Sequence, residues 1–203
     1  MAENLFLNTI NGQKQNRTPV WIMRQAGRYL KEYRIIRNTQ KDFITFCLNP
    51  KQASAVTLQP IARYGFDAAI IFSDILLVPW ALEQNVQFKP NVGPLLDPLE
   101  VPGSLDQKLI DNLPHKLAPV REAIRITKAN LSTETALIGF AGAPWTIMTY
   151  MAEGGTSRDF IKTRGWAWQY RKGVDALLDS LIESTISFLT LQAEAGVDAL
   201  MLL

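Results

Sequence analysis

Short apolar runs alternate along the chain with longer segments in which apolar residues recur at helical spacing. The runs have no polar face; they cover Ala68 to Phe72, Thr135 to Phe140 and Ala199 to Leu203. Continuous apolar strands are expected where both sides of a sheet are covered. The alternation therefore predicts an α/β fold with parallel strands joined by helices, as in α/β barrels and doubly wound sheets.

The segments of helical spacing account for much of the remaining sequence. They are Arg24 to Arg37, Pro50 to Tyr64, Ser104 to Leu131, Pro144 to Ala152 and Ala167 to Ala195. A stretch rich in proline and glycine, Lys89 to Gly103, interrupts the pattern and predicts a long loop.

A faint repeat links two of the strands. Gly65-Phe66-Asp67-Ala68-Ala69 and Gly196-Val197-Asp198-Ala199-Leu200 each follow a helix and open an apolar run. Each glycine suits a helix C-terminal turn. The first copy runs on to Phe72-Ser73-Asp74, and the equivalent position of the second copy falls beyond Leu203. We therefore expect residues 1–203 to be the N-terminal part of a single domain whose C-terminal part is absent.

Composition narrows the class of protein. With 203 residues, 47% of them hydrophobic, the chain is long enough to bury a sizeable core. It has no run of about 18 uninterrupted apolar residues, so no membrane span is predicted. The polar N-terminus lacks the features of a secretory signal, and a cytoplasmic location is expected by default. The net charge of +2 is too small to indicate a nucleic-acid-binding protein.

The counts of cysteine and histidine limit the chemistry. The single cysteine, Cys47, excludes an internal disulfide, and the single histidine, His115, leaves too few ligands for a zinc cluster. His115 lies in a segment of loop and helix-start character and is predicted to be a solvated surface residue. No metal site is therefore predicted, and the chemistry is expected to depend on Arg, Lys, Asp, Glu or Tyr.

The first candidate site is a basic segment. Between Pro19 and Arg37 five positive charges stand against one acid. Guanidinium groups bind carboxylates through paired hydrogen bonds, so several arginines together indicate a phosphate or a ligand with several carboxylates. Arg24 and Arg28 share a face if the segment is helical. The alternative is a solvated amphipathic helix, although a glycine inside it, Gly27, is costly without a reason.

The second candidate is Asp74, the only charge in the stretch Ala68 to Pro79. In parallel α/β folds functional residues lie at the carboxyl ends of strands. Helix capping explains an aspartate at a strand-to-helix junction equally well. The residues themselves leave both interpretations open.

The third candidate is the segment Gly139 to Tyr150, a strand followed by a glycine turn and a proline suited to a first helical turn. Its glycine spacing is weak evidence for an anion site, and no nucleotide motif is present. Tyr150 within it either presents its hydroxyl to a ligand or fills the core; its surroundings alone favour core packing.

Three of these motifs together resemble the uroporphyrinogen decarboxylase family. They are Arg24-Gln25-Ala26-Gly27-Arg28, Phe72-Ser73-Asp74 and Gly139-Phe140-Ala141-Gly142-Ala143-Pro144-Trp145-Thr146. The likeness spans essentially all 203 residues, and the first motif is highly specific to that family.

The resemblance implies a distorted (β/α)8 barrel, a TIM-like barrel of the uroporphyrinogen decarboxylase type, incomplete in this chain. It also implies a homodimer in which no cofactor is used. Members of the family remove carbon dioxide from the four acetate side chains of uroporphyrinogen, an octa-carboxylate tetrapyrrole, to give coproporphyrinogen in haem biosynthesis.

The resemblance also assigns roles to residues. Arg24, Gln25, Arg28 and Arg37 fall on family positions that line the substrate cleft. Asp74 falls on the carboxylate that accepts hydrogen bonds from the pyrrole N–H groups, and Tyr150 on the active-site tyrosine. Arg24 falls on the position proposed for the proton donor, although a guanidinium is ordinarily a poor acid.

The chain departs from the family in length. The family's serine after the third predicted strand and its C-terminal histidine have no counterpart here. Two alternatives follow: a corrinoid or thiol methyltransferase of the same superfamily, which needs a His-x-Cys zinc site, and an inactive truncated fragment that binds tetrapyrrole. We expect residues 1–203 alone to be poorly soluble and inactive, because an incomplete barrel exposes strand edges.

Overall fold

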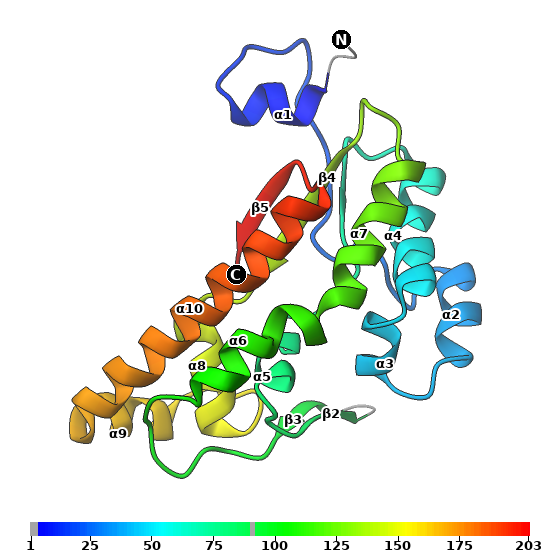
Figure 1. Ribbon diagram of the computed structural model, residues 1–203. Helices are drawn as coiled ribbons and strands as arrows, with labels where there is room; N and C mark the ends of the chain where they lie inside the picture. The colour runs from blue at the N-terminus through cyan, green and yellow to red at the C-terminus, as the bar shows by residue number, and fades with distance from the viewer. Residues whose placement is uncertain (1–3, 90–91) are drawn as a thin grey trace. The chain divides into compact units, whose positions relative to one another are not determined.

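The structure is a computed structural model that describes residues 4–89 and 92–203 (Figure 1). Its described residues form two compact units. Unit 1 contains residues 4–73 with Ala118–Phe140 and Leu191–Met201, and unit 2 contains Asp74–Leu117, Ala141–Thr190 and Leu202–Leu203 apart from residues 90–91. No helix of the described residues is long and apolar enough to cross a membrane.

The predicted strands are present and form one sheet in the order β1-β4-β5. They are β1 (Ala68–Ile70), β4 (Ala136–Ala141) and β5 (Ala199–Leu202). β1 and β4 are parallel, with Ala68 opposite Ala136. Between β4 and β5 the hydrogen bonds advance in the same direction along both strands, from Asp198 N to Leu137 O and from Leu203 N to Ala141 O. The predicted parallel α/β fold is confirmed.

Two details of the strand predictions are wrong. β1 ends at Ile70 rather than at Phe72, because the amide of Phe72 donates to the hydroxyl of Thr57 instead of to a strand. The prediction that each strand is covered on both sides holds for β1 and β4, whose residues are all buried. In β5, Leu200 and Leu202 are 45% and 56% exposed, since no element of the described residues covers that side.

Unit 1 also contains helices. They are α1 (Leu5–Ile10), α2 (Lys31–Asn38), α3 (Phe43–Cys47), α4 (Pro50–Tyr64) and α7 (Ala118–Asn130). α4 has the predicted bounds: the side chain of Asn49 caps its first turn, and Gly65 ends it with a φ of 65°. α4 packs along α7 (Figure 1). Leu30, Tyr33, Phe46 and Val56 form a buried core beside α4.

The predicted helix from Arg24 to Arg37 is wrong in its first half. Residues 24–30 form turns, and α2 begins only at Lys31. The side chain of Gln25 explains the difference, because it is buried and hydrogen-bonded to β1, which prevents it from lying on a helix surface. Arg24 and Arg28 therefore do not share a helix face.

Unit 2 holds a hairpin and a group of helices. They are α5 (Leu77–Ala81), β2 (Val86–Lys89), β3 (Gly93–Leu96), α6 (Gln107–Lys116), α8 (Pro144–Glu153), α9 (Ile161–Gln169) and most of α10 (Arg171–Ala195). α8 confirms the predicted helix at Pro144. The predicted loop Lys89 to Gly103 is partly wrong, because β3 pairs antiparallel with β2; Pro90 of this stretch lies outside the described residues.

Two long predicted helices are each interrupted. The helix predicted from Ser104 to Leu131 ends at Lys116 and restarts at Ala118. Pro119 accounts for the break, because it has no N–H to donate to the carbonyl of His115, which accepts from Leu117 instead. The helix predicted from Ala167 is divided between α9 and α10 at Tyr170.

Candidate functional site

The first group of candidate residues lies on the turn before α2 in unit 1. Arg24 and Arg28 are exposed, whereas Gln25 between them is 1% exposed. The turn is closed by a hydrogen bond from Leu30 N to Gly27 O of 3.0 Å, and the hydroxyl of Tyr29 donates to Gln25 O. The structure therefore presents two guanidinium groups on one short, internally bonded turn.

Arg34 and Arg37 on α2 extend this basic surface. The guanidinium of Arg34 donates to Arg28 O at 2.7 Å and so holds the turn that carries Arg28. Arg37 is half-buried; it donates to Gln40 O at 3.2 Å and lies 6.0 Å from the ring centroid of Phe46. Arg34 was not among the predicted site residues. Nothing in its sequence position indicates that its guanidinium contacts the carbonyl of Arg28.

Asp74 and Tyr150 lie in unit 2. Asp74 is half-buried, and its carboxylate accepts from Leu76 N at 2.8 Å just before α5. This bond closes an Asx turn before α5; the N-cap residue of α5 is Leu76 and no side chain caps the helix, so the capping interpretation is not confirmed. Tyr150 lies on α8 and is half-buried, and α8 packs against α5.

Gly142 explains the glycine turn between β4 and α8. A Cβ at this position would collide with Ile147 and would approach Ile75, the neighbour of Asp74, to 3.1 Å. The glycine is therefore required for close packing of the turn against the segment that carries Asp74. This is a sufficient reason for the motif without an anion site.

The structural role of the two aspartates in the repeat was not predicted from the sequence. Asp67 N donates to Val20 O at 2.9 Å while its carboxylate accepts from Val20 N at 2.7 Å. Asp198 repeats the arrangement with Leu137, at 2.8 Å and 2.7 Å. Each carboxylate also binds a cation: Arg17 donates to Asp67, and Lys128 to Asp198. The shared Gly-x-Asp pattern was the available signal.

Charge on Asp67 is stabilised by this arrangement. The hydrogen bond from Arg17 is the largest cause that lowers the pKa of Asp67, and it outweighs the opposing effect of burial. Asp67 is therefore a structural carboxylate at the amino end of β1.

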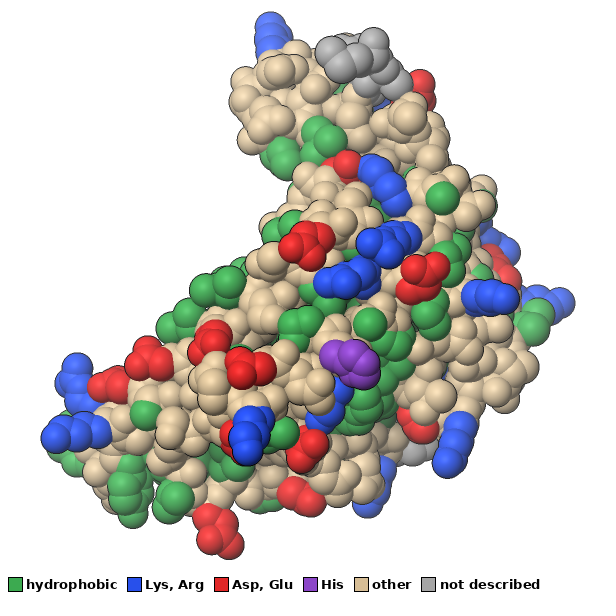
Figure 2. Space-filling model, in the orientation of Figure 1, with side chains coloured by type: hydrophobic (Ala, Val, Ile, Leu, Met, Phe, Trp, Pro, Cys, Tyr) green, Lys and Arg blue, Asp and Glu red, His purple; other side chains and the backbone are tan. Residues whose placement is uncertain are grey.

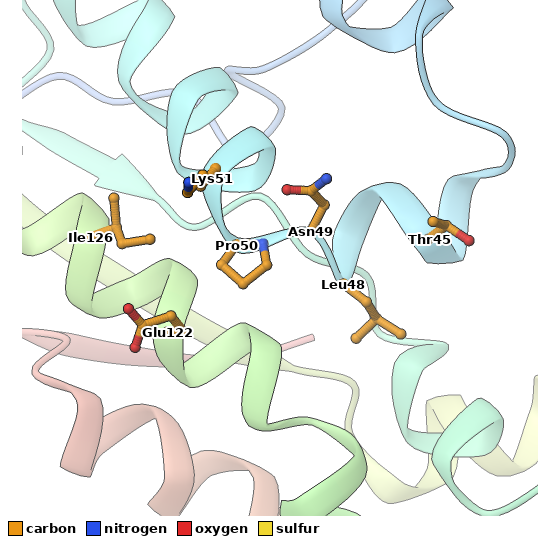
Figure 3. Close-up of a pocket in the computed structure, with 7 residues that line it drawn as sticks. All are labelled: Thr45, Leu48, Asn49, Pro50, Lys51, Glu122 and Ile126. Atoms are coloured by element: carbon orange, nitrogen blue, oxygen red, sulfur yellow. The ribbon is translucent and has the colours of Figure 1, made fainter.

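A cavity of about 460 Å³ opens in unit 1 between the start of α4 and α7 (Figure 3). Its lining residues are Thr45, Leu48, Asn49, Pro50, Lys51, Glu122 and Ile126. None of them is a predicted site residue. The described residues contain no group of three or more His, Cys, Asp or Glu side chains placed to hold a metal. His115 is exposed, as predicted, and is visible on the surface in Figure 2.

Comparison with solved structures identifies the class of fold. A methyltransferase from Methanosarcina mazei superposes with a TM-score of 0.73 over 96% of this chain and 56% of that chain, at 17% identity. A likeness at such low identity shows the fold alone. It places the chain among barrel-type α/β proteins.

Comparison with known sequences identifies the family. The model of the uroporphyrinogen decarboxylase (URO-D) family matches residues 1–203. "Uroporphyrinogen decarboxylase" of Maricaulis maris is 45% identical over 202 residues, which is 100% of this chain and 58% of that protein. The protein of the same name from Rhodospirillum rubrum is 46% identical, over 96% of this chain and 56% of that protein. The chain belongs to the uroporphyrinogen decarboxylase family, and it spans somewhat more than half the length of these relatives.

Proposed function

We propose that the protein catalyses the cofactor-independent decarboxylation of the four acetate side chains of uroporphyrinogen to give coproporphyrinogen. The observation that carries the proposal is the turn with two exposed arginines, Arg24 and Arg28, in a chain whose relatives bear the name of that enzyme. Residues 1–203 would then be part of a single barrel domain.

The basic turn suits a substrate with eight carboxylates. Arg24, Arg28 and Arg37 would each pair with a propionate or acetate group, because a guanidinium offers paired donors in a plane that matches a carboxylate. Their charges would also attract the anionic substrate before it binds.

Asp74 would stabilise the reaction's cationic intermediate. Protonation of the pyrrole carbon next to an acetate leaves a positive charge on the ring, and the bond to the carboxylate then breaks with its electrons neutralising that charge. Carbon dioxide leaves, a second proton completes the methyl group, and the pyrrole carbon then releases the first proton to restore the aromatic ring. A carboxylate held near the pyrrole N–H groups stabilises the cation electrostatically. Tyr150 would donate to the reacting acetate, and Arg24 would be the proton donor.

The test combines two measurements on the natural polypeptide that carries this sequence. Its intact mass is determined, and its conversion of uroporphyrinogen to coproporphyrinogen is followed under anaerobic conditions, with Asp74→Ala as control. Turnover that disappears in Asp74→Ala supports the proposal. A natural product without turnover would overturn it in favour of an inert, tetrapyrrole-binding role.

The zinc content of the protein distinguishes the methyltransferase alternative from the proposed decarboxylase. That chemistry needs a His-x-Cys site, and the only histidine and cysteine of this sequence, His115 and Cys47, are far apart in the chain. One zinc per natural polypeptide by elemental analysis, together with methyl transfer, would favour the alternative.

We also propose a cytoplasmic homodimer. In unit 2 the side chain of Trp168 is 90% exposed, and Ile161 and Tyr170 nearby in sequence are 73% and 48% exposed. Such apolar exposure is typical of a surface that a partner covers. Analytical ultracentrifugation of the natural polypeptide tests the assembly, and a monomer at micromolar concentration would contradict it.

A further inference from the structure

Gln25 differs from its neighbours on the basic turn, because its side chain points into unit 1. Its carboxamide uses both of its polar atoms: Nε2 donates to Ala68 O at 2.6 Å, and Oε1 accepts from Ile70 N at 3.1 Å. With 1% of the residue exposed, no part of the side chain is available to a ligand in the described structure.

The two hydrogen bonds have the pattern that the backbone of a neighbouring strand would make with β1. β1 bonds to β4 through the carbonyl of Asp67 and the amide of Ile71, so the carbonyl of Ala68 and the amide of Ile70 face the opposite edge. In a parallel ladder, one residue donates to position i−1 of the next strand and accepts from position i+1. The carboxamide of Gln25 reproduces this around Ala69. It thereby pairs a strand edge that would otherwise be buried without partners.

A second buried glutamine makes a comparable contact in unit 1. The side chain of Gln192 accepts from Phe140 N at 2.9 Å and donates to Phe140 O at 2.8 Å, and the residue is fully buried. Gln192 carries no arginine beside it in the sequence. It is therefore a matched control for the loss of a buried carboxamide that pairs a strand.

We propose that Gln25 is a positioning residue for Arg24 and Arg28, and that its side chain acts through β1 without contacting the substrate. The inference rests on the proposed function. Because Gln25 anchors the turn directly after Arg24, and Arg28 follows three residues later, both guanidinium groups start from a backbone fixed to the sheet. Pre-organised groups lose less freedom on binding, so the anchor lowers the cost of gripping the carboxylates.

The first test uses no substrate. Hydrogen exchange of the Ile70 amide is compared in the wild-type natural polypeptide and in Gln25→Ala, together with the melting temperature. We expect exchange at Ile70 to accelerate at least 10-fold and the melting temperature to fall by about 5 °C, since two buried backbone groups lose their partner. Unchanged exchange at Ile70 would overturn the proposal.

The second test uses Gln25→Glu, with Gln192→Glu as control. Above its pKa the new carboxylate cannot donate to Ala68 O, whereas below it the protonated acid can. We therefore expect the KM for uroporphyrinogen, relative to wild type, to rise about 10-fold at pH 8 and to recover as the pH is lowered, with kcat less affected. Gln192→Glu is expected to lose stability without this change in KM.

The outcomes separate the two proposals. A raised KM in Gln25→Ala with unchanged melting temperature would indicate a direct substrate contact and overturn the positioning role. Absence of turnover in the wild type would overturn the proposed function, while the exchange of Ile70 would still decide whether Gln25 anchors the turn.

Discussion

Asp67 precedes β1 and Asp74 follows it, and the two carboxylates have different surroundings. Asp67 accepts two hydrogen bonds from Arg17, at 2.8 Å and 2.5 Å, and a third from Val20 N at 2.7 Å. Asp74 accepts from Leu76 N at 2.8 Å, a local bond from two residues further along the chain. The first carboxylate links segments about 50 residues apart, whereas the bond from Leu76 N to the second is local to the turn before α5.

The same contrast is familiar from barrel folds, in which residues at the amino ends of strands serve stability and those at the carboxyl ends serve chemistry. Asp198 before β5 supports this, because it repeats the bonding of Asp67 with Lys128 and Leu137. An aspartate at the start of a strand is thus a structural device used twice, and Asp74 is not a third copy of it.

Replacing each carboxylate with its amide tests most directly whether Asp67 and Asp74 have different roles. In the natural polypeptide we expect Asp74→Asn to reduce kcat by roughly 10³-fold, because the neutral amide no longer stabilises a cationic intermediate. Asp67→Asn is expected to retain most of the activity. Anaerobic turnover of uroporphyrinogen measures both.

Thermal unfolding supplies the control for this pair. Asp74→Asn should keep its melting temperature within a few degrees, since the amide oxygen still accepts from Leu76 N. If Asp67→Asn lost turnover and Asp74→Asn did not, the assignment of the two ends of β1 would be reversed.

A second comparison concerns two arginines. Arg17 is bound to Asp67, whereas none of the described residues forms an ion pair with Arg24. We expect Arg24→Ala to lower kcat/KM by about 10-fold or more, the value of one charge-assisted contact to the substrate. Arg17→Ala is the control and should change kcat/KM little. A loss of similar size in both variants would indicate a general effect of charge instead of a specific contact.

The sequence predicted the fold where periodicity and capping agree. Pro50 to Tyr64 is correct at both ends, since Asn49 caps one end and Gly65 closes the other. The strands were found because they are uninterrupted apolar runs. The pairing of β2 with β3 was missed because the prolines and glycines of this stretch indicate a loop; Gly93, whose φ is 99°, opens β3.

The residues of the candidate site could be predicted from the sequence, but their arrangement in space could not. The family resemblance supplied Arg24, Arg28 and Asp74 as candidates, but helical spacing placed the two arginines on one helix face. The error lies at Gln25, which the resemblance assigns to the substrate cleft and whose side chain is buried against β1. A carboxamide that pairs a strand 43 residues away leaves no local signal in the sequence. Long-range side-chain bonds of this kind override intrinsic helix propensity.

The pH dependence of the free energy of unfolding tests the structural role of Asp67. The hydrogen bond from Arg17 lowers the pKa of Asp67 in the folded state, so its carboxylate stabilises the fold fully above the unfolded-state pKa of about 3.9. We expect Asp67→Asn to reduce the free energy of unfolding by about 1 to 2 kcal/mol between pH 5 and 8.

This difference should shrink as the pH falls through the lowered pKa of Asp67, because the wild-type carboxylate then takes up a proton and loses its ion pair. Urea unfolding of both proteins at several pH values measures it. A difference that grew on acidification would contradict the sign of the shift.

The smallest effect is expected at the second copy of the repeat. Asp198→Asn keeps an oxygen for Leu137 N and loses only the ion pair with Lys128, whose side chain is 39% exposed. Solvent screens such a pair, and Lys128 donates from one nitrogen whereas Arg17 donates from two nitrogens to both oxygens of Asp67, so we expect a loss of about 0.5 to 1 kcal/mol, less than at Asp67. Urea unfolding in low and high salt is the measurement, with Lys128→Met as the matched removal of the other partner. If Asp198→Asn cost more than Asp67→Asn, the ion pair with Lys128 would contribute more than the one with Arg17, and the expected order of the two sites would be wrong.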